Sequence, residues 1–250
     1  MSRSRWEVVY DDVRGRIERA ELRDGDQVPG ELHLAELHRV SRNTVRTALM
    51  RLEQEGLITA GRGRLGRTVR TYAPLTWSLT AYERGTRRDD PARGVDDWSA
   101  GVKEQGREPH QEVTVSIEPA PSHVSEWLHL APGAMVVRRS RRRTVDNRPY
   151  QLSTSWFPER VARDTPLMEQ RDVAMPGGIL AAIGHPQRRL RDEITVRMPT
   201  PDESRLLELS VGTPVCQHVR IGYGADDVPV RVMQTIAPGD RNRLVYELEV

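Results

Sequence analysis

Residues 41–58 of this 250-residue chain read SRNTVRTALMRLEQEGLI. The stretch predicts one helix, because Ser41 is a favoured N-cap residue and Gly56 stands where a glycine commonly ends a helix. With about 100° of turn per residue, four apolar side chains fall on one face. They are Val45, Ala48, Leu49 and Leu52. We therefore expect this face to be buried and the opposite face to be exposed.

The exposed face carries residue types that recognise DNA. Arg42 and Arg46 are one turn apart near the start of the helix, and Asn43 lies beside them. An arginine can donate two hydrogen bonds to guanine, an asparagine suits adenine, and a recognition helix presents its N-terminal half to base edges. The free N–H groups at the helix start, by Ser41 and Thr44, can bind a phosphate. We predict that these five residues contact DNA.

The neighbouring segments predict two further helices and a hairpin. Apolar residues recur at helical spacing over residues 5–23, and residues 31–38 form a shorter second candidate. Residues 57–60 and 67–72 have the pattern of two short strands joined by a loop. Three helices followed by a hairpin are the layout of a winged helix-turn-helix domain.

The loop of this hairpin admits two interpretations. Residues 61–66 read GRGRLG and match G-x-G-x-x-G, a pattern of dinucleotide sites. Such a site requires the pattern to follow a strand and open a helix within a βαβ unit, whereas a strand is expected directly after this loop. We therefore interpret the loop as the tip of a wing. We expect Arg62, Gly63 and Arg64 to reach a phosphate or the minor groove.

The charge distribution is compatible with a nucleic-acid partner. The chain has 38 basic and 36 acidic residues and a formal charge of +2. Residues 39–70 nevertheless hold eight arginines against two glutamates, which is typical of a polyanion-binding surface. Lys103 is the only lysine, so arginine is abundant throughout and position must decide its role.

Composition also excludes several classes of protein. Cys216 is the only cysteine, which excludes an internal disulfide framework and a cysteine-rich zinc module and fits a reducing cytoplasm. No segment approaches the ~20 apolar residues of a membrane span, and no secretory signal is expected at the start. The seven histidines are scattered. We expect a cytoplasmic protein with no membrane partner, metal or cofactor.

The pattern changes from residue 96 onward. Alternating apolar residues predict strands at residues 112–118, 134–145, 149–157, 190–198, 214–223 and 228–236. Short helices are expected after Ser122 and after a capping box formed by Thr200 and Glu203. Antiparallel strands with interspersed helices predict an α+β domain.

These patterns predict two domains. The DNA-binding domain spans residues 1–72 and the α+β domain spans residues 96–250. Residues 73–95 are poor in aliphatic side chains and rich in Arg, Asp, Gly and Pro, so we expect a connector that is exposed except where Trp77 and Tyr82 pack.

Two neighbouring strands of the second domain are candidates for a ligand site. Side chains repeat every two residues along a strand, so Arg141 and Arg143 share one face, as do Ser153 and Ser155 on the next strand. Arginines and hydroxyls that converge inside a domain suit an anionic or polar ligand.

The first domain resembles the winged-helix domain of the GntR family of bacterial transcription regulators. Its pattern is Ser-Arg-x-Thr-Val-Arg-x-Ala-Leu, then Leu-x-x-Glu-Gly-Leu, and the resemblance extends over residues 6–72. Residues 28–35 depart from it, because they read VPGELHLA where the family usually has Leu-Pro-Ser-Glu-Arg-x-Leu-Ala. Leu32 replaces an arginine that often contacts DNA, so the operator of a relative does not transfer.

The second domain resembles the UTRA effector-binding domain of the HutC-type branch of this family. The matching segments are Trp98 with Gly106-Arg107, and residues 128–133, 141–149, 155–158, 207–214, 228–231 and 240–241. They occur in the family's order and span residues 75–250. The resemblance implies a fold similar to chorismate lyase, with ligand binding but no catalysis.

The resemblance also implies roles for individual residues. In this family the Arg-x-Arg pair and the serine strand line the effector site, which points to Arg141, Arg143, Ser153 and Ser155. Arg231 stands where related sugar-phosphate-sensing members often carry a glutamate. The resemblance therefore places Arg231 in the site and favours a more acidic or otherwise different ligand over a simple sugar.

We expect a homodimeric transcription regulator, most simply a repressor. Two winged helices would bind an inverted repeat of double-stranded operator DNA, and the C-terminal domains would form the dimer and hold a small effector that relieves repression. Three alternatives stay open. They are a ligand-independent repressor like some plasmid-transfer regulators, a DNA-binding module fused to a lyase-like enzyme, and an architectural DNA binder. No catalytic residue is visible beside the arginines.

Overall fold

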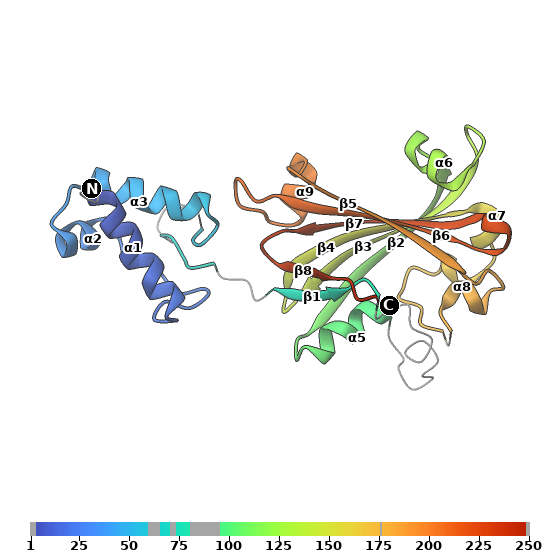
Figure 1. Ribbon diagram of the computed structural model, residues 1–250, viewed down its shortest axis with the longest axis horizontal. Helices are drawn as coiled ribbons and strands as arrows, with labels where there is room; N and C mark the ends of the chain where they lie inside the picture. The colour runs from blue at the N-terminus through green and yellow to red at the C-terminus, as the bar shows by residue number, and fades with distance from the viewer. Residues whose placement is uncertain (1–3, 60–65, 71–73, 81–95, 176, 249–250) are drawn as a thin grey trace. The chain divides into compact units, whose positions relative to one another are not determined.

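The computed structural model describes residues 4–59, 66–70, 74–80, 96–175 and 177–248. It consists of two compact units, one built on residues 1–73 together with 209–214, and the other on residues 74–208 and 215–250. The first unit is helical, and the second is built around a sheet (Figure 1). Each unit has its own hydrophobic core.

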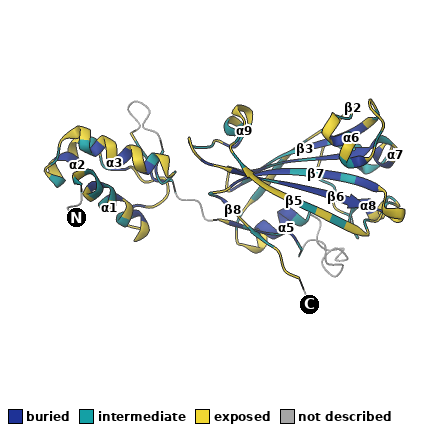
Figure 2. Ribbon diagram, turned by 45° about the horizontal axis from the view of Figure 1, so that its top comes forward, coloured by how far each residue is buried: buried dark blue, intermediate teal, exposed yellow. Residues whose placement is uncertain are grey.

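The first unit is a three-helix bundle. Its helices are α1 (Arg5–Glu18), α2 (Glu31–His38) and α3 (Arg42–Gln54). Each contributes buried side chains to one core, among them Val9, Leu34 and Leu49. Figure 2 shows the inner side of these helices buried and the outer side exposed.

The end of α1 differs from the expected helix over residues 5–23. The helix ends at Glu18, and Ala20 has a left-handed φ of 57°. The amides of Glu21 and Leu22 both bond to the carbonyl of Arg16, which closes the helix end. The turn places Leu22 in the core at 8% exposure, so tertiary packing overrides the continued helical pattern.

The hairpin after α3 is present in reduced form. Ile58 pairs with Val69, and Thr68 pairs with Gln27 from the loop before α2. The amide of Thr59 donates to the carbonyl of Thr68 at 2.8 Å. Within the described parts of the two expected strands, residues 57–59 and 67–70, the pairing consists of isolated bridges.

The second unit contains a six-stranded antiparallel sheet with the order β2-β3-β4-β7-β6-β5. The strands are β2 (Pro109–Pro119), β3 (Met135–Val145), β4 (Arg148–Pro158), β5 (Arg189–Arg197), β6 (Val215–Tyr223) and β7 (Pro229–Pro238). Each expected strand is confirmed with ends shifted by a few residues. Asp146 and Asn147 both have positive φ, 50° and 61°, which suits a tight hairpin between β3 and β4.

Short helices flank the sheet. They are α5 (Asp97–Glu104), α6 (Ser122–Leu128), α7 (Glu159–Ala162), α8 (Ile179–Ala182), α9 (Pro201–Leu206) and the 3-10 turns η4 (Pro166–Met168) and η5 (Ala225–Asp227). The capping box of Thr200 and Glu203 is confirmed at α9. Ser122 is the first residue of α6 and not its cap, since Pro121 takes the N-cap position.

Part of the expected connector is a strand. Leu75–Ser78 forms β1, which pairs in parallel with β8 (Asn242–Val245). Leu75, Trp77 and Leu79 are all buried, and their alternation fits the period of a strand. The aliphatic-poor composition of residues 73–95 as a whole concealed this short pattern. Tyr82 lies outside the described residues.

Candidate DNA-binding and effector-binding sites

The outer side of α3 is exposed, as its sequence predicts. Val45, Ala48, Leu49 and Leu52 are buried at 1% exposure or less, whereas the opposite side faces solvent (Figure 2). The exposed side chains of that side include Arg42, Asn43 and Arg46, and Thr44 is half-buried. The guanidinium-bearing side chains of Arg42 and Arg46 are 64% and 56% exposed. The helix therefore offers two cations from its first two turns.

The start of α3 is capped by Ser41. Its hydroxyl accepts a hydrogen bond from the amide of Thr44 at 3.1 Å and lies 2.8 Å from the Thr44 hydroxyl. The cap fixes the helix at its N-terminal end, where the backbone carries partial positive charge. A helix start of this kind can bind a phosphate through its first backbone amides.

An acidic residue that the sequence pattern did not single out lies beside these arginines. Glu31 accepts a hydrogen bond from Nη2 of Arg46 at 2.9 Å and another from Nη1 of Arg67 at 3.3 Å. Nε of Arg67 donates in turn to Glu53 at 2.7 Å. The helices and the base of the wing are thus joined by one chain of ion pairs.

The structure does not place the expected wing tip. Arg62, Gly63 and Arg64 lie outside the described residues, so the contacts expected of them rest on the sequence alone. Their flanks are placed, because Gly66 and Thr68 follow on the return side of the hairpin.

In the second unit, the register of the sheet brings the expected arginines and serines together. Arg141 pairs with Ser153 across β3 and β4, and Arg143 pairs with Gln151. Cross-strand partners lie on the same face of a sheet. Ser153 is buried and shares a 3.0 Å hydrogen bond with the hydroxyl of Thr235 on β7. This face is consequently polar in its middle.

Arg143 is held in place by other protein groups. It is buried at 9% exposure, donates to Asp96 at 3.4 Å and to Gln111 at 3.3 Å, and lies 4.8 Å from the ring centre of Trp98. Asp96 is also the N-cap of α5, since it accepts from the amide of Ser99 at 2.7 Å. Arg143 therefore anchors α5 on the sheet, and its charge is largely matched.

Arg141 differs from its neighbour on the strand. Within the described residues it donates no side-chain hydrogen bond, and its Nε is buried without a partner. Burial lowers the pKa of its guanidinium, and the carboxylates of Asp96 and Asp172 oppose that shift. The site thus contains a guanidinium with hydrogen-bonding capacity to spare, close to two acids.

The two acids have opposite pKa shifts. Burial, and then the charge of Asp96, raise the pKa of Asp172. The pKa of Asp96 is lowered despite its burial, because Arg143 and the amide of Ser99 stabilise its charged form. The backbone amide of Asp96 donates to Asp172 at 3.3 Å. Asp172 is therefore the acid that gains a proton more readily.

Arg231 and Ser155 form a pair of their own. Nη2 and Nε of Arg231 lie 3.1 and 3.3 Å from the hydroxyl of Ser155, and the guanidinium lies 5.8 Å from the ring centre of Phe157. The structure places both residues on this face of the sheet, next to Met233, whose sulfur lies 3.0 Å from Nη2 of Arg231.

Arg139 is a residue of this face that was not expected in the site. It is fully buried and donates to the backbone carbonyls of Leu167, Glu169 at 2.7 Å and Arg171 at 2.9 Å. Burial, and next the charge of Arg141, lower its pKa to about 10. Arg139 fastens the segment that carries Asp172 over the sheet. Its position two residues before Arg141 was the signal available in the sequence.

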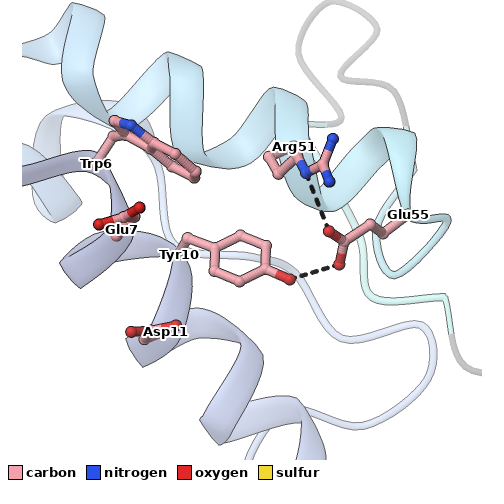
Figure 3. A pocket seen from close by; sticks show the side chains of 6 residues that line it. All are labelled: Trp6, Glu7, Tyr10, Asp11, Arg51 and Glu55. Carbon is pink, nitrogen blue, oxygen red and sulfur yellow. Dashed lines mark hydrogen bonds and ion pairs between the residues drawn. The ribbon is translucent and has the colours of Figure 1, made fainter. Parts of the chain in front are cut away.

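A separate hollow lies on the first unit between α1 and α3. It is lined by Trp6, Glu7, Tyr10, Asp11, Arg51 and Glu55 (Figure 3). The hydroxyl of Tyr10 donates to Glu55 at 2.5 Å, and Arg51 pairs with the same carboxylate at 3.1 Å. Tyr10, Arg51 and Glu55 therefore bond to one another across this hollow.

Two further observations bear on other kinds of site. Among the described residues there is no group of three or more His, Cys, Asp or Glu side chains that could hold a metal ion. None of the helices in the described ranges is long and apolar enough to cross a membrane.

Sequence profiles of known families match both units. Residues 6–65 match the profile of bacterial regulatory proteins of the gntR family, and residues 104–243 match the UTRA domain. An HTH-type transcriptional regulator of Streptomyces coelicolor is 29% identical over 98% of this chain and 93% of its own length. The HTH-type transcriptional regulator GgaR of Escherichia coli is 27% identical over 90% of this chain and 81% of its own.

Solved structures show the same fold. A crystal structure of a GntR-family transcriptional regulator has a TM-score of 0.62 at 24% identity, and the match covers 99% of this chain and 98% of that one. The structure of PhnF from Mycobacterium smegmatis has a TM-score of 0.59 at 24% identity and covers 95% and 99%. The relatives from Streptomyces coelicolor and Escherichia coli are both named as HTH-type transcriptional regulators.

Proposed function

Because this chain belongs to the GntR family of bacterial transcription regulators and carries a UTRA effector-binding domain, we propose that it is a repressor whose α3 reads an operator and whose sheet domain binds a small anion. The observation that carries this proposal is the pair of exposed arginines on a capped helix whose other side is fully buried. The sheet domain supplies the regulatory input.

In the DNA-binding part, Arg42 and Arg46 contact base edges in the major groove. Ser41, Asn43 and Thr44 position the helix start against the backbone and the neighbouring bases. Arg62, Gly63 and Arg64 form the tip of the wing and bind a phosphate or the minor groove. Residues 1–72 constitute this part of the chain.

In the effector-binding part, Arg141 is the group that meets the ligand. It is the arginine of the Arg-x-Arg pair without a hydrogen bond to the described residues, whereas Arg143 is engaged by Asp96, Gln111 and Gln151. Ser153, and the pair of Ser155 with Arg231, complete the polar lining. A small anion with hydroxyl or amide groups matches this set of donors and acceptors.

Two copies of the chain bind an inverted repeat, and the effector domains form the dimer. The dimer has one arrangement that spans both half-sites and another that does not. The effector binds more tightly to the arrangement that does not, and so shifts the population away from DNA. The protein acts in the cytoplasm, on the nucleoid.

The test is selection of DNA from a random duplex library by the full-length protein, followed by effector screening. The proposal expects one enriched sequence with two-fold symmetry, and a small anion that raises the thermal stability of the protein and releases the selected duplex. Binding of all sequences alike, with affinity set by salt alone, would contradict it.

A further inference from the structure

One carboxylate adjoins both exposed arginines at the start of α3. Glu31, the first residue of α2, accepts from Nη2 of Arg46 at 2.9 Å and lies 3.4 Å from its Nε. Nη1 of Arg67 donates to the same carboxylate at 3.3 Å, and Nη2 of Arg42 lies 4.0 Å from it. One glutamate therefore contacts or adjoins three cations.

The Glu31 carboxylate is less exposed than the Arg46 guanidinium that it binds. The Glu31 side chain is 17% exposed, whereas that of Arg46 is 56% exposed. The hydrogen bond from Arg46 is the largest cause that lowers the pKa of Glu31, so the carboxylate is charged at neutral pH. A duplex that approaches α3 would meet the guanidinium first and the carboxylate behind it.

The contact uses only one edge of the guanidinium. Arginine has five N–H donors in a plane, and Glu31 engages the edge formed by Nε and Nη2. The edge formed by Nη1 and Nη2 can still donate two hydrogen bonds, the geometry with which arginine binds O6 and N7 of guanine. Glu31 and a base can therefore hold Arg46 at the same time.

We propose that Glu31 is a positioning residue for operator recognition, which orients Arg46 toward one base pair and weakens binding to unrelated DNA through its negative charge. A long side chain held in its bound orientation loses less entropy on binding. A carboxylate near the phosphates lowers the affinity for every sequence alike, so that fewer unrelated sites are occupied at a given protein concentration. This inference rests on the proposed function, because it requires α3 to read DNA.

A purely structural role makes a different prediction. Glu31 also joins α2 to the base of the wing through Arg67, which bonds to Glu53 as well. A residue with only that role would affect stability and overall affinity, and would leave the preference among bases unchanged. Base preference is therefore the decisive readout.

The experiment compares Glu31→Gln with Glu36→Gln in the full-length protein. Glu36 is exposed on the same helix and has no ion pair among the described residues, so its variant removes the same charge without touching Arg46. Each protein is titrated with the duplex selected by the parent, with duplexes changed at single base pairs, and with an unrelated duplex. Circular dichroism verifies folding.

One base pair of the operator should be the one at which Arg46→Ala loses its preference. At this base pair, Glu31→Gln should reduce the ratio of affinities for the correct and the changed duplex by about 5–10-fold. Its affinity for the unrelated duplex should rise by roughly 2–3-fold. Glu31→Asp keeps the charge on a shorter side chain, and should lose discrimination without that rise. Glu36→Gln should keep the discrimination of the parent.

Parental discrimination in both Glu31 variants would overturn the inference. So would a loss of base discrimination by Glu31→Gln that stays undiminished in the Arg46→Ala background, because Glu31 sets base preference only through Arg46. If the parent itself enriches no sequence, the proposed function fails, and this inference fails with it. Enrichment by the parent with unchanged Glu31 variants overturns the inference alone.

Discussion

The same residue type has two different roles in the two units of this protein. On α3, Arg42 and Arg46 are 64% and 56% exposed, and a single carboxylate adjoins both. On β3, Arg139 and Arg143 are buried, and backbone carbonyls or polar side chains surround them. An exposed arginine can engage an external partner, whereas a buried arginine with satisfied donors organises the protein itself.

Arg141 lies between these two cases. It lies on the same face of β3 as the buried Arg139 and Arg143 and is itself half-buried, yet it donates no side-chain hydrogen bond within the described residues. The comparison therefore separates arginines by the state of their donors and not by their position in a motif. It predicts three classes of effect, on stability, on DNA binding and on effector response.

The largest effect should follow from Arg139→Met. The change leaves the carbonyls of Leu167, Glu169 and Arg171 without their donor, and each buried unsatisfied group costs about 1–3 kcal/mol. We expect the second unit to lose about 3–5 kcal/mol of unfolding free energy, measured by thermal and urea denaturation. The control is Arg138→Met, since that side chain is 41% exposed and its ion pair with Glu118 is long, at 3.8 Å. Equal, small losses of unfolding free energy in both variants would remove the distinction between the buried and the exposed arginines of β3.

The next effect concerns the exposed pair. Arg42→Ala and Arg46→Ala should each cost about 1–3 kcal/mol in operator affinity and relax base preference, while stability stays nearly unchanged. Fluorescence anisotropy with the selected duplex measures the loss. Arg51→Ala is the matched control, because Arg51 is on the same helix, is 55% exposed and pairs with Glu55 near α1. A loss for Arg51→Ala as large as for the other two would place the DNA contact elsewhere.

Arg141→Met tests the arginine that lies on the sheet but has donors to spare. A hydrogen bond to a charged group contributes about 1.5–3 kcal/mol, so affinity for a small anion should fall at least about tenfold. Operator affinity without effector should equal that of the parent. The measurements are calorimetric titration with each anion that stabilises the parent, and release of labelled duplex. Full effector response in this variant would exclude Arg141 from the site.

The smallest effect is a pH dependence. Asp172 has a raised pKa and faces Arg141, Arg143 and Asp96, so a falling pH neutralises it first. A neutral Asp172 no longer repels an anion, and affinity for the anion should therefore rise as the pH falls through this pKa, by no more than about tenfold. Asp172→Asn should abolish this part of the dependence in calorimetric titrations between pH 4.5 and 8. An affinity that falls on acidification in the parent would reverse the assigned sign.

Local pattern was sufficient to predict which side of α3 is buried and which is exposed. The cap, the buried stripe and the exposed arginines of α3 all depend on residues within one helix, and the structure has them as expected. Glu31 escaped notice because its contact with Arg46 spans 15 residues and two helices. The alternating strands were equally accessible, since the period of two is a local property.

Pairing within the effector domain was not accessible in this way. Arg141 and Arg143 look alike in a strand pattern, and only tertiary contacts distinguish them. Asp96 is brought to Arg143 over 47 residues, and the carbonyls that bind Arg139 come from 28–32 residues further along the chain. The end of α1 and the strand β1 were missed for the same reason, because core packing decided both.

Methylation interference on the selected operator tests most directly whether the outer side of α3 reads bases. N7 of guanine is exposed in the major groove, so a methyl group there blocks an arginine that binds this edge. We predict that methylation of one guanine in each half-site prevents binding by the parent, and that Arg46→Ala or Arg42→Ala binds DNA with and without this methyl group equally. Interference at no guanine, or an identical interference pattern in the parent and both variants, would contradict the account.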